Sequence, residues 1–189
     1  MTYSYILMAV CSLWVASEIV ISRKRRSAAT SSHEDHRSLT VLWFALALGP
    51  TSAGMLTAVR SAMMPAPIRA YAYWGGLALI IIGIAIRWTA IATLKQFFTV
   101  DVAIAKDHKV IDHGLYAVVR HPSYSGTLLS FLGLGLAFVN WLSLAACLFF
   151  SIAGFAYRIA VEERALTAAL GDDYRSYAAR TKRLIPGVF

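Results

Sequence analysis

Two short segments of the sequence contain residues that could do chemistry. One, residues 158–163, has a cation and a carboxylate, and the other, residues 120–124, has a proline that could begin a helix. Arg158 and Glu162 are four residues apart, so on a helix they share one face. In the segment 120–124 we expect Pro122 to stand in the first turn of a helix, where its missing N–H is not needed. The backbone amides that follow it would carry the positive end of the helix dipole. They could therefore bind a carboxylate or a phosphate.

Spacing predicts that these two segments meet. Pro122 and Asn140 are 18 positions apart, and so are Asn140 and Arg158. Both intervals are apolar, and at about 1.5 Å per helical residue they return to the same depth. We therefore expect a tight helical hairpin that turns near Asn140 and has both open ends at one surface.

The composition is that of a membrane protein. Of the 189 residues, 58% are hydrophobic and 15% are charged, which excludes a soluble or disordered chain. Several apolar runs approach the roughly 20 residues that a helix needs to cross a bilayer. We predict an all-α integral membrane protein with one domain, residues 1–189, and five transmembrane helices. The expected spans are 3–21, 39–59, 74–94, 122–139 and 141–157.

Basic residues predict the topology. Fifteen of the eighteen Lys and Arg residues fall after the first span, in the polar stretch 95–121 or in the tail from residue 158. Arg60 and Arg69 are left for the opposite side, so we expect the N-terminus outside and the C-terminus in the cytosol. The basic residues then serve topology and lipid headgroups, and we expect no nucleic-acid partner. The tail should be amphipathic, with a helix stop at Gly171.

Three features inside the spans lead to further expectations. Gly49, Pro50 and Gly54 predict a kink or weak point in the second span. Gly133 and Gly135 are expected to allow close helix packing. Arg87 stands about 12 Å from the cytosolic end of its helix, so it could either extend to the interface or line a cavity.

Several spaced motifs resemble the isoprenylcysteine carboxyl methyltransferase family. The resemblance covers about half of the chain, roughly residues 95–189, which would be its catalytic half. The motifs are Gly114-Leu115-Tyr116, the run Arg120-His121-Pro122-Ser123-Tyr124-Ser125-Gly126, Arg158 followed by Glu162-Glu163-Arg164-Ala165-Leu166, Gly171-Asp172-Asp173-Tyr174, and Leu184-Ile185-Pro186-Gly187.

The resemblance implies S-adenosylmethionine as methyl donor and a prenylated cysteine, entering from the bilayer, as acceptor. The catalytic residues it implies are Arg158, near the acceptor carboxylate, and Glu162. The residues it implies for the donor are His108, Val110, Ile111, Tyr116, His121, Pro122, Ser123, Tyr124 and Glu162.

The chemistry of such a transfer fits these residue types. A sulfonium cation is attracted by a carboxylate such as Glu162 and by aromatic faces. A C-terminal carboxylate, with a pKa near about 3.5, is ionised at neutral pH, so the reaction needs no general base. Catalysis would then consist of positioning and exclusion of water. Arg158 would contact the carboxylate oxygen that does not attack.

Other interpretations stay open at this point. The acceptor could be a phospholipid amine or a small thiol, and the C-terminal half also resembles NADPH-dependent sterol reductases. A membrane scaffold without activity is a third possibility, in which Arg158 and Glu162 form only an interfacial ion pair. We expect no metal site, although two sets of possible ligands occur. They are His33, Glu34, Asp35 and His36, in an expected polar loop, and His108, His113 and His121.

Overall fold

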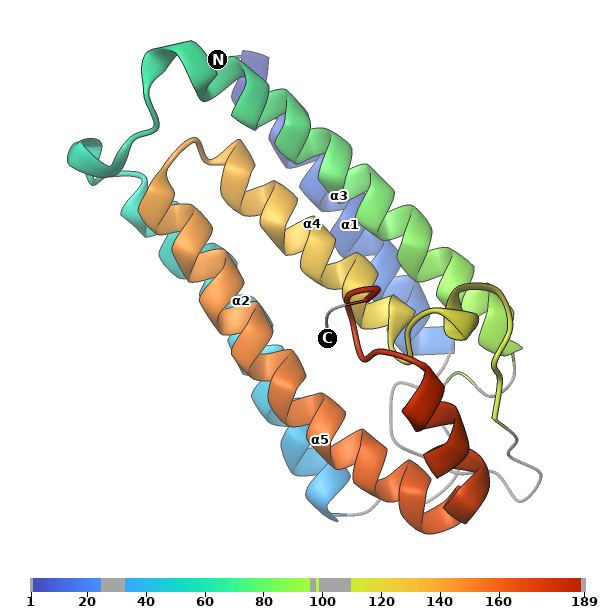
Figure 1. Cartoon of the computed structure of the whole chain (residues 1–189). Coiled ribbons are helices and arrows are strands. Elements are labelled where there is room, and N and C mark those ends of the chain that lie inside the picture. The colour runs from blue at the N-terminus through green and yellow to red at the C-terminus, as the bar shows by residue number, and fades with distance from the viewer. Residues whose placement is uncertain (1, 25–32, 96–97, 99–109, 188–189) are drawn as a thin grey trace.

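The computed structural model describes residues 2–24, 33–95, 98 and 110–187, and this part of the chain is helical (Figure 1). Four of the helices are long and apolar enough to cross a membrane, so the chain is a multi-pass membrane protein. The helices are α1 (Thr2–Lys24), α2 (His33–Leu56), α3 (Ala66–Leu94), α4 (Pro122–Ala137) and α5 (Trp141–Arg180), with the 3-10 turns η1 (Arg60–Ala62) and η3 (Gly114–Ala117).

Helix α2 differs from the expected span at both ends. It begins at His33 rather than at residue 39, so residues 33–36 form its first turn and the predicted polar loop there is wrong. It ends at Leu56 rather than at residue 59 and continues through Pro50 as a helix. The early start has a physical reason. Asp35 lies in this first turn, where it is buried in an ion pair with Arg158 of α5.

Helix α4 is shorter than the span 122–139 expected for it. Its 16 residues cover about 24 Å, less than the hydrocarbon core of a bilayer, and it is not among the four candidate spans. α4 lies between α3 and α5 (Figure 1), packs extensively on α3 and contacts α5. Its polar groups are therefore covered mainly by protein.

Glycines allow α3 and α4 to approach closely. A Cβ atom on Gly83 would lie 2.4 Å from the carbonyl oxygen of Gly126, and one on Gly133 would lie 2.4 Å from that of Gly76. Neither contact is possible for a larger residue. The expected packing role of Gly133 and Gly135 is confirmed, since a Cβ on Gly135 would lie 2.8 Å from the Cα of Leu144.

The hairpin between α4 and α5 forms as the spacing predicts. Val139 adopts a positive φ of 53° and turns the chain. Asn140 then caps α5, because its Oδ1 accepts hydrogen bonds from the amides of Leu142 at 2.9 Å and Ser143 at 3.2 Å. Its Nδ2 donates to the carbonyl of Val59 and ties the turn to the end of α2.

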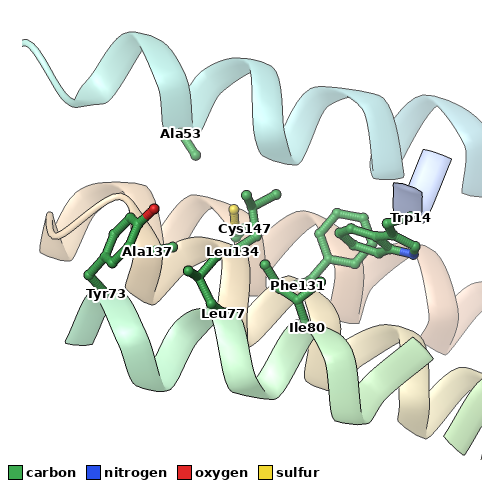
Figure 2. Close-up of a cluster of buried hydrophobic side chains, with 9 residues drawn as sticks. All are labelled: Trp14, Ala53, Tyr73, Leu77, Ile80, Phe131, Leu134, Ala137 and Cys147. Carbon is green, nitrogen blue, oxygen red and sulfur yellow. The ribbon is translucent and has the colours of Figure 1, made fainter. Parts of the chain in front are cut away.

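A buried apolar cluster holds the middle of the bundle together (Figure 2). Trp14 of α1 meets Phe131 of α4 edge to face, with ring centroids 5.0 Å apart. Ile80 of α3 and Cys147 of α5 complete the contact between helices and are fully buried. Helix α1 is thereby packed against α3 and α4.

Beyond its apolar part, α5 carries the tail back to the hairpin. Gly171 interrupts it with a φ of 55°, as expected for a helix stop, and the last turns run on to Arg180. The chain then reverses, so that Arg120 donates its amide to the carbonyl of Lys182 at 2.7 Å and His121 to that of Arg183 at 3.0 Å. The tail therefore lies against the start of α4 (Figure 1).

Candidate functional site

A cavity of about 730 Å³ opens between the five helices. It gathers most of the site residues expected from the sequence. Those that line it are Val110, Ile111, Tyr116, His121, Ser123, Tyr124, Arg158 and Glu162. Pro122 is buried in the first turn of α4 and does not line the cavity, and His108 lies outside the described residues.

The two ends of the hairpin meet at this cavity. The hydroxyl of Tyr124 donates a hydrogen bond of 2.8 Å to Oε2 of Glu162. His121 stacks on Tyr124 with ring centroids 5.5 Å apart, and its Nδ1 lies 3.8 Å from Glu162. The juxtaposition predicted from the two intervals of 18 residues is confirmed. It places one carboxylate and two rings on the same wall.

Glu163 next to this wall is a structural anchor. Beyond the expected span 141–157, its carboxylate accepts hydrogen bonds from Arg120 at 2.8 Å and Arg183 at 2.9 Å, and it lies 3.3 Å from Nε2 of His121. Burial by itself would raise the pKa of Glu163, but these three partners outweigh it and lower the pKa to about 2. The carboxylate stays ionised and pins the tail to the hairpin.

The tail also covers the start of α4. Ser125 donates its hydroxyl to the carbonyl of Leu184 at 2.6 Å, and the amide of Tyr124 donates to the carbonyl of His121. The expectation that the Tyr124 amide is available for an anion is therefore wrong. His121 immediately precedes α4, and its carbonyl accepts hydrogen bonds from the amides of Tyr124 and Ser125 in the first turn.

Tyr116 supplies a second aromatic wall from η3. It is buried, and its carbonyl accepts a hydrogen bond of 2.8 Å from the hydroxyl of Tyr177 in the last part of α5. Burial, reinforced by the negative charge of Glu162, raises the pKa of the Tyr116 phenol, so the ring stays neutral. A neutral ring facing a carboxylate is a suitable wall for a cation.

Arg158 lies on the same helix face as Glu162, but it has a partner that the sequence did not reveal. It is 1% exposed and donates to the carboxylate of Asp35 and to the hydroxyl of Ser38, the latter at 2.6 Å. Asp35 and Ser38 are three residues apart on α2, which puts both on one face. That polar pair at the edge of an apolar run was the available signal.

Arg87 has a parallel arrangement on the opposite wall. It forms an ion pair with Glu18 of α1, with 2.7 Å between Nε and Oε1 and 2.7 Å between Nη2 and Oε2. Its Nη1 donates to the hydroxyl of Ser123 at 2.8 Å. Both Arg87 and Glu18 line the cavity, which decides between the two roles left open for Arg87. Glu18 was missed, although a single carboxylate inside an apolar run is itself a signal.

Away from these charges the cavity is lined by apolar side chains. They come from α1, α2 and α4 and extend toward the hairpin turn. They include Trp14, Leu42, Leu46, Phe131, Leu134 and Phe138. The cavity thus has a charged end, where helices α3, α4 and α5 meet the loop before α4, and a long apolar arm. Such a space can hold a molecule with a polar head and a greasy chain.

Comparisons with known proteins agree with this arrangement. Residues 76–168 match the model of the isoprenylcysteine carboxyl methyltransferase (ICMT) family. A probable protein-S-isoprenylcysteine O-methyltransferase of Oryza sativa subsp. indica is 32% identical over 139 residues, 71% of this chain and 73% of that protein. Protein-S-isoprenylcysteine O-methyltransferase B of Arabidopsis thaliana is 37% identical over 115 residues, and the match spans 58% of its length. A solved structure of the eukaryotic intramembrane Ras methyltransferase ICMT superposes with a TM-score of 0.67 at 26% identity, covering 96% of this chain and 65% of that one.

Proposed function

Because the chain belongs to the isoprenylcysteine carboxyl methyltransferase family, we propose that it transfers a methyl group from S-adenosylmethionine to the carboxylate of a prenylated cysteine. The observation that carries this proposal is the set of side chains that line the cavity. One end presents Glu162, Tyr124 and Tyr116, and the other is an apolar arm between α1, α2 and α4. A cationic donor and a lipophilic acceptor each find matching chemistry there.

The donor end fits a sulfonium cation. The Glu162 side chain is 26% exposed, and its carboxylate is hydrogen-bonded to Tyr124 on the cavity wall. Tyr116 adds a neutral ring whose pKa is raised by burial. S-adenosylmethionine supplies an activated methyl group when bound. Glu162 and the two rings would hold the cation, and Val110 and Ile111 also line the cavity.

The acceptor end needs orientation more than proton transfer. A prenylcysteine carboxylate is already ionised, so the chain must place one oxygen and exclude water. Arg158 belongs to the wall that bears Glu162, and we propose that it orients this carboxylate through the oxygen that does not attack. Its bonds to Asp35 and Ser38 hold the guanidinium still. The tail bonded to the start of α4 covers part of the charged end, which limits the access of cytosolic water there.

The topology proposed with this function has five spans. α4 joins the four longer helices as a short crossing that α3 and α5 cover, with the N-terminus outside and the C-terminus in the cytosol. The cavity then opens toward the cytosol at its charged end and toward the bilayer at its apolar arm. Lipid can enter between α1 and α2, which are attached to different sides of the bundle.

The deciding experiment measures transfer directly. The purified protein in detergent receives S-adenosylmethionine with a labelled methyl group and N-acetyl-S-farnesylcysteine, and we expect a labelled methyl ester. The matched control is the same acceptor with its carboxylate replaced by an amide, which should stay unlabelled. Phosphatidylethanolamine and a small thiol serve as further acceptors. Labelling of either one in place of the carboxylate would overturn the carboxyl assignment, and binding of NADPH instead of the donor would overturn the methyltransferase assignment.

A further inference from the structure

The ion pair between Glu18 and Arg87 lies deep in the bundle. Arg87 stands seven residues before the end of α3 at Leu94, about 10 Å along the helix. Its side chain is 13% exposed and that of Glu18 is 18% exposed. Charged residues at such a depth are expensive, and they are typical of substrate paths. Both residues line the cavity where its charged end gives way to the apolar arm.

The backbone of Arg87 is held firmly against α4. A Cβ atom on Gly126 would lie 2.8 Å from the amide nitrogen of Arg87, so the two helices nearly touch at this level. Ser123 stands one turn earlier on α4 and accepts the hydrogen bond from Nη1. Packing therefore fixes the backbone of Arg87, and the contacts with Ser123 and Glu18 determine the direction of its guanidinium.

Glu18 occupies one edge of the guanidinium and leaves another edge for a ligand. Oε2 of Glu18 accepts a hydrogen bond from Nη2 at 2.7 Å, and the hydroxyl of Ser123 accepts one from Nη1 at 2.8 Å. Oε1 of Glu18 lies 2.7 Å from Nε, an ion-pair contact without hydrogen-bond geometry. A guanidinium has five N–H groups. Among the described residues, these two hydrogen bonds leave three N–H groups without a hydrogen-bond acceptor, namely that of Nε, one on Nη1 and one on Nη2. Two N–H groups on neighbouring nitrogens match the two oxygens of a carboxylate.

Helix α1 links this edge to the apolar arm. Cys11, Trp14 and Glu18 follow each other at helical spacing, so they share the face of α1 that lines the cavity. Figure 2 shows Trp14 from this face against Phe131 of α4. An acceptor whose chain lies along Trp14 therefore brings its polar end to the level of Arg87.

We propose that Glu18 is a positioning residue for the acceptor, which holds Arg87 so that its open edge binds the acceptor carboxylate. This inference rests on the proposed function and adds a second arginine, on the wall opposite Arg158. Arg158 is 1% exposed between Asp35 and Ser38, whereas Arg87 presents more of its surface to the cavity. The methyl donor also carries a carboxylate, so the test must separate the two ligands.

The test compares Glu18→Gln and Glu18→Asp with the parent protein in detergent. The measurements are the KM of N-acetyl-S-farnesylcysteine, the affinity for S-adenosylmethionine by calorimetry, and the relative affinity for the acid acceptor and its amide analogue. We expect Glu18→Gln to raise the acceptor KM by about tenfold or more, with donor affinity within about twofold. The preference for the acid over the amide should fall by a similar factor.

Glu18→Asp keeps the negative charge, so it can still be measured if Glu18→Gln does not fold. It shortens the side chain by one methylene, and we expect a smaller rise in the acceptor KM. Asp173→Asn, which removes an exposed carboxylate from the tail, is the matched control and should leave every value unchanged. An unchanged acceptor KM in both Glu18 variants would overturn the inference. So would a weakened donor affinity at unchanged acceptor KM, which would assign Arg87 to the donor.

The measured affinities for the acid acceptor and its amide analogue distinguish this inference from the proposed function. If the parent protein binds the acid in preference to the amide but transfers no methyl group, the proposed function fails while the role of Glu18 is still measured by binding. If transfer occurs and the acid preference survives in both Glu18 variants, the inference alone fails.

Discussion

The hydroxyl of Tyr124 and the carboxylate of Glu162 are joined by a hydrogen bond of 2.8 Å across the α4–α5 hairpin, although 38 residues separate them in the sequence. The bond directs the carboxylate along the cavity wall and leaves its charge available. His121 stacks on the same tyrosine, so a substitution at His121 or Tyr124 should also alter the position of Glu162 on α5.

Removing the charge of Glu162 should weaken donor binding. Glu162→Gln keeps the size of the side chain, so we expect the affinity for S-adenosylmethionine to fall by about 1 to 3 kcal/mol while the fold survives. Calorimetry in detergent measures this. Tyr124→Phe is the control, because it removes only the hydrogen bond and keeps the ring, and its effect should be smaller. Equal donor affinity in Glu162→Gln and the parent would mean that the donor site is elsewhere.

The buried pair of Arg158 and Asp35 predicts a strong effect on stability. Arg158→Ala leaves a carboxylate that is 1% exposed without its cation, which should cost about 3–5 kcal/mol of unfolding free energy. The double variant Asp35→Leu/Arg158→Leu should recover much of this loss, because both charges leave together. Denaturant unfolding in mixed micelles checks it. A double variant as unstable as Arg158→Ala would show that the pair is not coupled.

Arg158→Lys separates orientation from charge. A lysine can keep the ion pair with Asp35 but lacks the planar fork of arginine. We expect donor affinity to stay close to the parent value and methyl transfer to fall by about a hundredfold, since a shift of about 1 Å costs that much in rate. Labelled-methyl transfer to N-acetyl-S-farnesylcysteine is the measurement. Parental activity in Arg158→Lys would remove Arg158 from the acceptor site.

The distribution of basic residues predicts the orientation in the membrane. A reporter fused after Phe189 should be cytosolic, and one inserted near Pro65, between α2 and α3, should be on the far side. Paired alkaline phosphatase and green fluorescent protein fusions read the two positions. Both reporters on one side would mean that α2 does not span as proposed.

Local pattern predicted much of the architecture. The apolar runs identified the long helices, and the equal intervals around Asn140 predicted the hairpin and the meeting of Tyr124 with Glu162. Gly133 predicted close packing, and Gly171 predicted the break in α5. These features depend on the fixed rise of a helix and on the conformation of single residues, so neighbouring residues contain the information.

The ion pairs were decided by the tertiary structure. Arg158 finds Asp35, 123 residues away, and Arg87 finds Glu18, 69 residues away. Each acid stood in the sequence as a polar residue in or beside an apolar run, with no pattern to name its partner. A buried charge must be paired, but the partner is whichever opposite charge the packing of distant helices brings within reach. That choice is made in space, and spacing along one helix does not contain it.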